Sequence, residues 1–373
     1  MSFSAVTDLA PQHIRDIAPY QPGKPVSELA RELGLNEAHI IKLASNENPL
    51  GVSPKALAAM TAALSQQALY PDGNGFALKD VIANKFSVNH DNIVLGNGSN
   101  DILEFAARTF LTPADSAVYS QHAFAVYPLA VKSVGARGIE VPAQNFGHDL
   151  DAMLAAIEPN TRLMFIANPN NPTGTFIDAT LLYAALKKVP ANVLVVMDEA
   201  YTEYLPKHLR VDTAGWIKVF PNLVISRTFS KAYGLAGLRV GYGLAHPDVV
   251  GLMNRVRQPF NVNSLAQTAA AAALLDNDFL ERSFLVNEQG MAQMLAGFAA
   301  LKLTHIPSFG NFVCIKIGAR GGGAGAVFQT LLKAGVIVRP IASYGMPDYL
   351  RISIGTKDEN AKFLAALQTA LGS

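Results

Sequence analysis

The chain has 373 residues, of which 50% are hydrophobic and 16% charged, and its net charge is +1. This composition predicts a globular protein of about two domains and gives no electrostatic reason to expect a nucleic acid or a membrane surface as partner. The single cysteine, Cys314, excludes an internal disulfide, and without a signal-like start or an apolar run long enough to cross a bilayer we expect a cytoplasmic protein.

The first 44 residues are punctuated by prolines and contain one short helical pattern, at 27–33. An arm of this kind is expected to pack on another surface, and Tyr20 is its candidate aromatic contact. A polar turn follows at 46–49, and helices are predicted at 54–64 and 76–86. Between these helices, Tyr70 stands at the start of a turn rich in Pro, Asp and Gly.

A short apolar strand at 92–95 runs into Gly96-Asn97-Gly98-Ser99-Asn100-Asp101 and then into a helix at 102–110. A strand, a glycine turn and a helix start can bind phosphate, because free backbone N–H groups and the positive end of the helix dipole point at the anion. The alternative is an ordinary helix cap, since Ser, Asn and Asp are common at helix starts.

From residue 117 the chain alternates between apolar strands and helices. The predicted strands are 117–120, 138–141, 163–167, 193–197, 223–226 and 239–244, and the predicted helices between them include 151–157 and 179–188. Such a pattern indicates a parallel sheet that is covered by helices on both faces. Ligands of these sheets bind beyond the carboxyl ends of the strands.

Three of these strand ends carry polar residues: the loop 168–174, the run Asp198-Glu199-Ala200-Tyr201, and the segment 226–241. Asp198 directly follows five apolar residues, and a buried carboxylate is costly without a cationic partner. A protonated pyridine nitrogen is such a partner.

The segment 226–241 places one lysine, Lys231, among small and hydroxyl residues and eight positions before Arg239. A lysine amine forms a Schiff base with an aldehyde, and Thr228, Ser230 and Arg239 can hold phosphate oxygens. Pyridoxal 5′-phosphate (PLP) carries both groups. By itself, a lysine of this kind is more often a solvated residue before a loop.

The C-terminal part contains predicted helices at 265–275, 279–301, 327–334 and 357–371, a strand pair within 303–317, and strands at 335–340 and 349–355. Each of the last two strands carries one arginine, Arg339 or Arg351, in an apolar run, which suggests either an anionic ligand or an edge-strand side chain that reaches water. The glycine run at 320–325 lacks the lysine of a phosphate loop and is predicted to be a surface loop.

Taken together, these motifs resemble the fold-type I PLP aminotransferases (class II aminotransferases), and within them the histidinol-phosphate aminotransferases. The resemblance covers nearly the whole chain. It rests on SNENPLG at 45–51, YPDG at 70–73, GNGSND at 96–101, NPNNPTG at 168–174, DEAY at 198–201, RTFSKAYGLAGLRVG at 227–241 and LRISIG at 350–355. It implies a large domain at 46–275 with a mostly parallel sheet, and a smaller α+β domain formed by 1–45 and 276–373.

The resemblance also implies roles for individual residues. Lys231, Asp198 and Tyr201 would be catalytic, with Lys231 as the Schiff-base lysine and Asp198 paired with the pyridine nitrogen. Phe124 falls where the family places a stacking aromatic, often Tyr, and Tyr70 matches a residue that reaches the neighbouring subunit's cofactor. The other cofactor-binding residues would be Ser99, Asn100, Asn171, Tyr201, Thr228, Ser230 and Arg239, and the substrate-side residues would be Tyr20, Asn46, Arg339 and Arg351, with no metal.

The implied activity is a transaminase that interconverts L-histidinol phosphate and 2-oxoglutarate with imidazole acetol phosphate and L-glutamate, acting on small molecules as a homodimer with shared active sites. Two other enzymes of the same fold are alternatives: an aromatic amino-acid aminotransferase and a threonine-phosphate decarboxylase. A PLP-fold module that only binds ligands is disfavoured, because both Lys231 and Asp198 are present.

Overall fold

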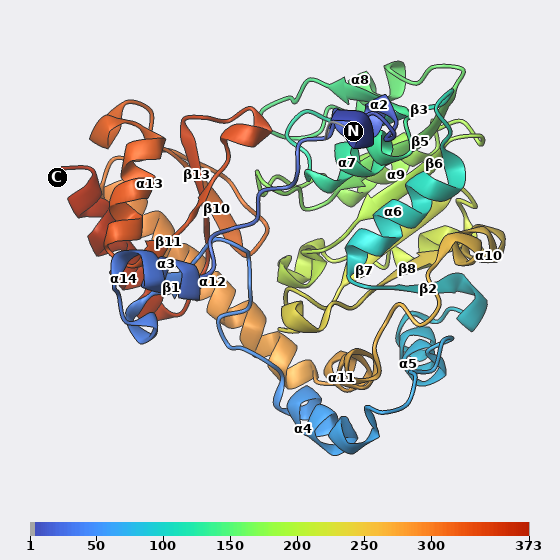
Figure 1. Ribbon diagram of the computed structural model, residues 1–373, viewed down its shortest axis with the longest axis horizontal. Helices are drawn as coiled ribbons and strands as arrows, with labels where there is room; N and C mark the ends of the chain where they lie inside the picture. The colour runs from blue at the N-terminus through green and yellow to red at the C-terminus, as the bar shows by residue number, and fades with distance from the viewer. Residues whose placement is uncertain (1–3, 373) are drawn as a thin grey trace.

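The computed structural model describes residues 4–372 and has two lobes joined by a long helix (Figure 1). The larger lobe contains a seven-stranded sheet. Its strands are β2 (Ile93–Gly96), β3 (Ser116–Ser120), β4 (Arg137–Val141), β5 (Thr161–Ala167), β6 (Leu194–Asp198), β7 (Leu223–Thr228) and β8 (Gly241–Ala245), in the spatial order β2-β8-β7-β6-β5-β3-β4.

The sheet is mostly parallel, as predicted, and only β8 runs against its neighbours β7 and β2. The loop from β7 to β8 contains no α-helix. Parallel neighbours need a long crossover, usually a helix, so without one the chain returns antiparallel. The strand predicted at 239–244 begins only at Gly241, because Arg239 has a left-handed backbone with φ 56°.

Both faces of the sheet are covered by helices, because successive strand residues point to opposite faces and both kinds are apolar. In β6, Leu194 and Val196 join one hydrophobic cluster, whereas Val195 and Met197 join the other. The first cluster includes α6 (Ser99–Phe110), α7 (Val126–Ser133) and α10 (Pro247–Val256); the second includes α4 (Pro54–Ala63), α5 (Phe76–Phe86), α8 (Leu150–Ala155), α9 (Ala179–Leu186) and α11 (Ser264–Leu274).

The smaller lobe contains an antiparallel four-stranded sheet, whose order along the sheet is β12 (Arg339–Pro340), β13 (Tyr349–Ser353), β10 (Phe312–Lys316) and β9 (His305–Ile306). The strand pair predicted within 303–317 is therefore present as β9 and β10. The single strand predicted at 335–340 is instead divided: β11 (Val336–Ile337) pairs in parallel with β1 (Ile41–Lys42), and β12 pairs with β13.

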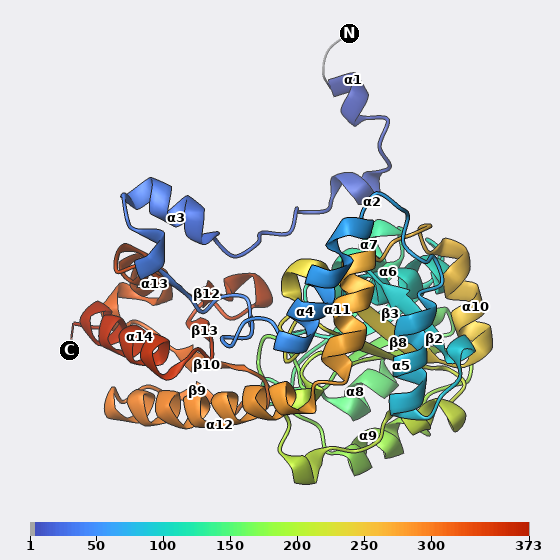
Figure 2. The same ribbon diagram turned by 90° about the horizontal axis from the view of Figure 1, so that it is seen from below.

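Three helices complete this lobe: α12 (Asn277–Ala300), α13 (Ala324–Lys333) and α14 (Lys357–Ala370). Their apolar residues, among them Phe298, Leu331 and Phe363, pack with the strands in one cluster. At 1.5 Å per residue, the 24 residues of α12 extend about 36 Å. This length lets α12 run from the larger lobe along the smaller one (Figure 2).

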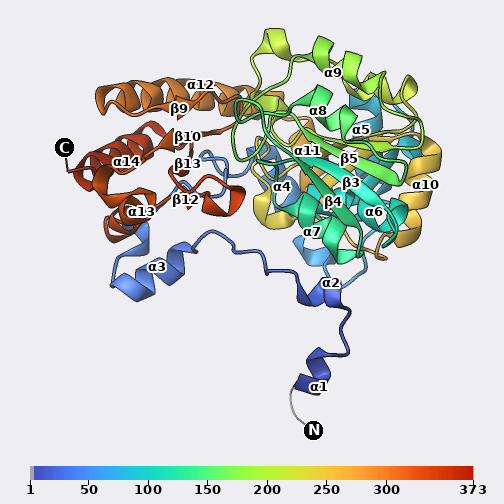
Figure 3. The ribbon, with the colours of Figure 1, turned by 90° about the horizontal axis from the view of Figure 1, so that it is seen from above.

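The N-terminal arm carries α1 (Ser4–Thr7), α2 (Gln12–Arg15) and α3 (Val26–Leu33). It passes from α7 of the larger lobe, which α2 contacts, to the smaller lobe, where Leu29 of α3 packs with Leu332 and Ile337. α1 projects away from both lobes (Figures 2 and 3). Between residues 4 and 372, no helix combines the length and the apolar character needed to cross a membrane.

Candidate active site

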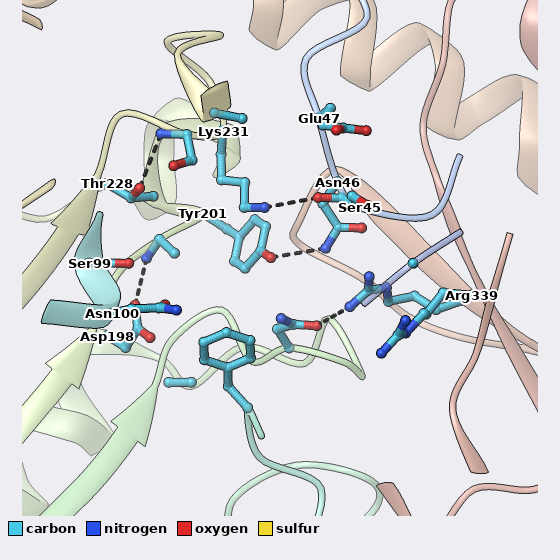
Figure 4. Close-up of a pocket in the computed structure, with 18 of the residues that line it drawn as sticks. Ser45, Asn46, Glu47, Ser99, Asn100, Asp198, Tyr201, Thr228, Lys231 and Arg339 are labelled. Atoms are coloured by element: carbon cyan, nitrogen blue, oxygen red, sulfur yellow. Dashed lines mark hydrogen bonds between the residues drawn. The ribbon is translucent and has the colours of Figure 1, made fainter. Parts of the chain in front are cut away.

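A cavity of about 230 Å³ lies between the lobes, at the carboxyl ends of β5, β6 and β7 (Figure 4). This is where a parallel sheet is expected to bind its ligand. Every site residue predicted from the sequence lines the cavity, with the exception of Tyr70. These lining residues are Tyr20, Asn46, Ser99, Asn100, Phe124, Asn171, Asp198, Tyr201, Thr228, Ser230, Lys231, Arg239, Arg339 and Arg351.

The amine of Lys231 reaches into this cavity from the loop after β7. Its Nζ donates a hydrogen bond to the carbonyl oxygen of Ser45 at 3.0 Å. Burial, followed by the positive charges of Arg351 and Arg239, lowers the pKa of Lys231 to about 8, although Glu47 opposes the shift. Compared with an ordinary lysine, an amine with this pKa has a much larger neutral fraction near neutral pH, and only the neutral form can act as a nucleophile or a base.

The carboxyl group of Asp198 stands at the end of β6 and is 6% exposed. Its oxygens accept hydrogen bonds from the Tyr127 hydroxyl at 2.9 Å and from the Ala200 N–H at 3.2 Å. Burial raises the pKa of Asp198 to about 6. Within residues 4–372 no cationic side chain forms a salt bridge with it, so a protonated ring nitrogen would supply the positive partner that burial demands.

Tyr201 and Asn171 present hydrogen-bond donors to the cavity. Burial raises the pKa of Tyr201 to about 12, so its hydroxyl keeps its proton at neutral pH. Asn46 Nδ2 donates to that hydroxyl oxygen at 2.9 Å. The oxygen of the Asn171 amide accepts from Arg351 Nη1 at 2.5 Å, which leaves the N–H₂ group of Asn171 free for a ligand.

An anion-binding cup forms where α6 begins. Its N-cap residue is Gly98, with φ 76° and no capping side chain, so an ordinary Ser or Asn cap is not what is found. The first N–H groups of the helix are therefore open to a ligand. Arg239 lies beside them and donates to Ser230 Oγ at 3.2 Å, while the Ser230 N–H donates to Thr228 Oγ1 at 3.1 Å.

Two glycines allow this close approach. A β-carbon on Gly98 would lie 2.4 Å from Arg239 Nη2, and one on Gly241 would lie 2.5 Å from the backbone nitrogen of Ser99. Both distances are far below van der Waals contact, so any larger residue would push the arginine or the helix start out of place. The cup thus depends on main-chain geometry that only glycine permits.

Arg351 lies on β13, at the side of the cavity opposite the sheet of the larger lobe. It is 6% exposed, donates from Nη2 to the Ala44 carbonyl at 2.7 Å, and lies over the Phe312 ring. Its Nε has no partner within the described residues. A buried guanidinium beside a cavity is suited to an anionic ligand, and the alternative of an edge arginine that reaches water does not apply.

Arg339 is tied to the N-terminal arm. Its Nη2 donates to the Gln21 carbonyl at 2.7 Å, and its guanidinium lies 5.7 Å from the centre of the Tyr20 ring. This contact holds the arm over the mouth of the cavity, where Tyr20 and Gly23 both line it. Phe124 supplies a flat apolar wall and meets the Tyr127 ring edge-on at 6.0 Å.

Tyr70 is not part of this cavity. It is 83% exposed and stacks on Phe260 of its own chain, with 4.8 Å between ring centres. A reach into the neighbouring subunit's site therefore stays a prediction.

Sequence reasoning missed several residues that support the site. Tyr127, which donates to Asp198, carries no motif signal beyond its place three positions after Phe124. The backbone carbonyl of Ser45 has no motif signal either, because every residue type carries a backbone carbonyl. Tyr344 also lines the cavity, and its carbonyl oxygen is 2.7 Å from His122 Nδ1.

The donor set fits PLP. A free amine, a buried carboxyl without a cation, and an open helix N-terminus flanked by an arginine are the three features that its aldehyde, ring nitrogen and phosphate require. No other chemistry suggested by the sequence uses all three.

Comparison with known proteins agrees with this geometry. The family model described as aminotransferase class I and II matches residues 38–367. A histidinol-phosphate aminotransferase of Methylobacillus flagellatus is 62% identical over 98% of this chain and 98% of its own length. Histidinol-phosphate aminotransferase 2 of Nitrosospira multiformis is 59% identical over 98% of this chain and 93% of its own.

Among solved structures, the histidinol-phosphate aminotransferase of Sinorhizobium meliloti in complex with pyridoxal-5′-phosphate superposes with a TM-score of 0.89. It is 28% identical, and the match covers 97% of each chain.

Proposed function

The chain belongs to the class I and II aminotransferase family, and from this premise we propose that it is a PLP-dependent histidinol-phosphate aminotransferase. It interconverts L-histidinol phosphate and 2-oxoglutarate with imidazole acetol phosphate and L-glutamate, a step of histidine biosynthesis. The observation that carries the proposal is that Lys231, the buried Asp198 and the glycine-lined anion cup face one cavity.

We assign the cofactor contacts as follows. The N-terminus of α6 with Ser99, Asn100, Thr228, Ser230 and Arg239 would hold the phosphate, and Asp198 would pair with the ring nitrogen. Asn171 and Tyr201 would donate to the phenolic oxygen, and Phe124 would stack on the ring. When bound, PLP supplies an electron sink for the pair released from the substrate Cα–H bond.

The protein's own groups then do the acid–base work. Lys231 Nζ takes the proton from the substrate Cα and returns it to the acceptor carbon, which its lowered pKa of about 8 favours near neutral pH. Asp198 holds its negative charge at the ring nitrogen, because a cation there offsets the desolvation of the carboxylate.

Two anions must be accepted in turn, because glutamate carries a carboxylate at the reacting end and histidinol phosphate carries a phosphate. Arg351 lines the cavity, and the Ala44 carbonyl and the Asn171 amide hold its guanidinium in place, so it is suited to both. Arg339, Tyr20 and Asn46 would contact the rest of the substrate.

The aromatic aminotransferase and decarboxylase alternatives have no structural observation in their favour. A direct experiment separates the three activities. Purified enzyme is mixed separately with glutamate, with L-histidinol phosphate, with phenylalanine and with L-threonine phosphate, and the visible absorption of the bound cofactor is followed. Loss of the band with the first two, and release of no carbon dioxide, is the expected result; a response to phenylalanine that exceeds the response to histidinol phosphate would contradict the proposal.

We further propose a cytoplasmic homodimer, with the larger domain at 46–275 and the smaller at 1–45 and 276–373. Several exposed apolar side chains support the dimer. Exposed apolar side chains gather on and around α4, α5 and α11, among them Leu57, Leu64, Leu69, Phe76 and Leu275. Helices α4 and α5 both pack against α11, and large exposed apolar side chains on such neighbouring helices are typical of an interface.

A further inference from the structure

A buried chain of three polar side chains connects β13 to Tyr201. Ser353 is the last residue of β13, Asn46 follows β1, and Tyr201 follows β6. Their exposed fractions are 2%, 1% and 3%, respectively. Ser353 is two positions from Arg351 but does not line the cavity. Any effect of Ser353 on the site is therefore transmitted through another residue.

The hydrogen bonds of Ser353 fix the direction of this chain. The backbone N–H of Asn46 donates to Ser353 Oγ at 2.8 Å, so Oγ is an acceptor there. The hydroxyl has one hydrogen of its own, and Asn46 Oδ1 accepts it at 2.9 Å. The left-handed backbone of Asn46, with φ 57°, brings its N–H and its side chain to the same hydroxyl.

The orientation of the Asn46 amide follows from this contact. With Oδ1 held by Ser353, the N–H₂ end faces Tyr201 and donates to its hydroxyl oxygen at 2.9 Å (Figure 4). Tyr201 is then an acceptor toward Asn46, and its own hydrogen is left over. In the described part of the chain no protein group accepts that hydrogen, so it is available to a ligand in the cavity.

The opposite orientation of the amide would reverse the role of Tyr201. The two ends of an asparagine amide have nearly the same size and differ in donor and acceptor character. If Oδ1 faced Tyr201, it would accept the phenolic hydrogen and withdraw it from the cavity. Ser353 would then meet two donors, the N–H and the N–H₂ of Asn46, and its own hydrogen would lose the acceptor it has now.

We propose that Ser353 is a positioning residue: its hydroxyl selects the Asn46 amide orientation that makes Tyr201 a hydrogen-bond donor to the bound cofactor. The proposal rests on the proposed function, in which Tyr201 donates to the phenolic oxygen of PLP. Its consequence is specific. Loss of the Ser353 hydroxyl weakens one donor bond in the cavity without removing any residue that touches the ligand.

The protonation of the Lys231 nitrogen in the resting holoenzyme reports this bond. A donor to the neighbouring phenolic oxygen stabilises the negative charge on that oxygen. The stabilised charge attracts the proton on the lysine nitrogen less strongly, so the donor lowers the pKa of that nitrogen. Ser353→Ala should therefore raise the midpoint pH of the visible absorption change, measured without substrate. The expected rise is roughly 0.5 to 1 unit, the equivalent of one ordinary hydrogen bond.

Three further variants make the test specific. Ser353→Thr keeps the hydroxyl and should return the midpoint to the wild-type value, and Ser353→Cys, a weaker donor, should give an intermediate midpoint. Ser116→Ala removes another fully buried hydroxyl, which is 2.9 Å from Thr161 Oγ1 at the opposite end of the sheet, and should leave the midpoint unchanged.

A double-mutant cycle identifies the route. Tyr201→Phe should raise the midpoint by at least as much as Ser353→Ala, and adding Ser353→Ala to Tyr201→Phe should produce no further rise. A wild-type midpoint in Ser353→Ala, or an equal shift with and without the Tyr201 hydroxyl, would overturn the proposal. The proposed function is tested separately, by the response of the wild-type absorption to amino donors. The resting midpoint is measured without these donors, so the two proposals can fail independently.

Discussion

Lys231 is an amine whose surroundings have prepared it for reaction. Burial and the two arginines Arg351 and Arg239 disfavour its protonated form and lower its pKa to about 8. Its hydrogen bond to the Ser45 carbonyl also directs the nitrogen into the cavity. A surface lysine would stay protonated up to about pH 10.4.

We therefore expect the cofactor-free enzyme to capture PLP at a rate that rises with pH and levels off above about 8. Stopped-flow absorption across pH 6.5–9.5 measures this rate. Arg351→Met removes one of the charges that lower the pKa of Lys231, so the pH profile of the capture rate in this variant should have its inflection at higher pH. In Lys231→Ala, borohydride should no longer link cofactor to protein; persistent linkage would reassign the reactive lysine.

Asp198 is a buried carboxyl group, and a cationic partner offsets the free-energy cost of burying its negative charge. Asp198→Ala should lower kcat/KM by about 100-fold or more, since removing one preorganised charge costs ~3 kcal/mol. Tyr127→Phe keeps the carboxyl group and removes the hydroxyl that donates to it at 2.9 Å, so kcat/KM should fall by less in this variant. The exposed acid Asp212 is the control, and its alanine variant should match wild type.

The pKa of about 6 for Asp198 in the free protein adds a pH dependence. Below that pH the carboxyl is protonated before the cofactor binds, so retention of PLP should weaken as the pH falls through 6. Dialysis at stepped pH measures the retained cofactor. Wild-type-like kinetics in Asp198→Ala would instead identify Asp198 as a structural acid.

Arg351 is expected to serve both half-reactions. Arg351→Ala should raise KM for glutamate and for histidinol phosphate alike, and Arg351→Lys should recover only part of the loss, because an ammonium group cannot replace a bidentate fork. Separate half-reaction titrations measure the two effects. If KM rises for only one of the two substrates, the two anions bind different residues, and Arg339 is the next candidate.

At the scale of elements, sequence patterns predict the helices and the buried strands well, because nearly continuous apolar runs such as 163–167 leave few other arrangements. They do not predict that β8 runs antiparallel, since direction depends on whether the connection contains a helix. They also place Arg239 in a strand, whereas its φ of 56° puts it in the loop that forms the anion cup.

The residues of the site also divide into those that the sequence reveals and those that it does not. Residues with unusual chemistry for their surroundings, such as Asp198 after an apolar strand, were recognisable from the sequence. Tyr127 and Ser353 were not, because an aromatic or a serine in an apolar run is ordinary, and their roles arise from contacts 71 and 307 positions apart. Long-range hydrogen bonds of this kind leave no local pattern.

The anion cup leads to a prediction about the start of α6. Gly241→Ala should raise the Kd for PLP at least ~10-fold, because the added β-carbon would lie 2.5 Å from the Ser99 nitrogen and must displace the helix start. Gly237→Ala, in the same loop, is the matched control, since no atom of residues 4–372 lies within 4 Å of an added β-carbon and its φ is not positive. Equilibrium dialysis against PLP compares the two; equal affinity would show that α6 does not bind the phosphate.

At the scale of the whole molecule, the described chain builds the cavity but leaves Tyr70 outside it. Tyr70 lies in the turn before α5, next to the apolar surface that we assign to the dimer, and its hydroxyl has no hydrogen bond in the described structure. A two-fold interface uses the same patch on both subunits and would bring each Tyr70 to the other subunit. We infer that the dimer has two shared sites and that the monomer is inactive.

A mixed-dimer experiment tests this inference. One chain carries Tyr70→Phe and the other Lys231→Ala, and each homodimer should be strongly impaired. If Tyr70 acts across the interface, the heterodimer has one site with both defects and one site with neither, so about half of the wild-type activity per dimer should return. If Tyr70 acts within its own chain, every site of the heterodimer keeps one defect and no activity returns. Verified heterodimers without recovery, or a monomer that is fully active on dilution, would rule out shared sites.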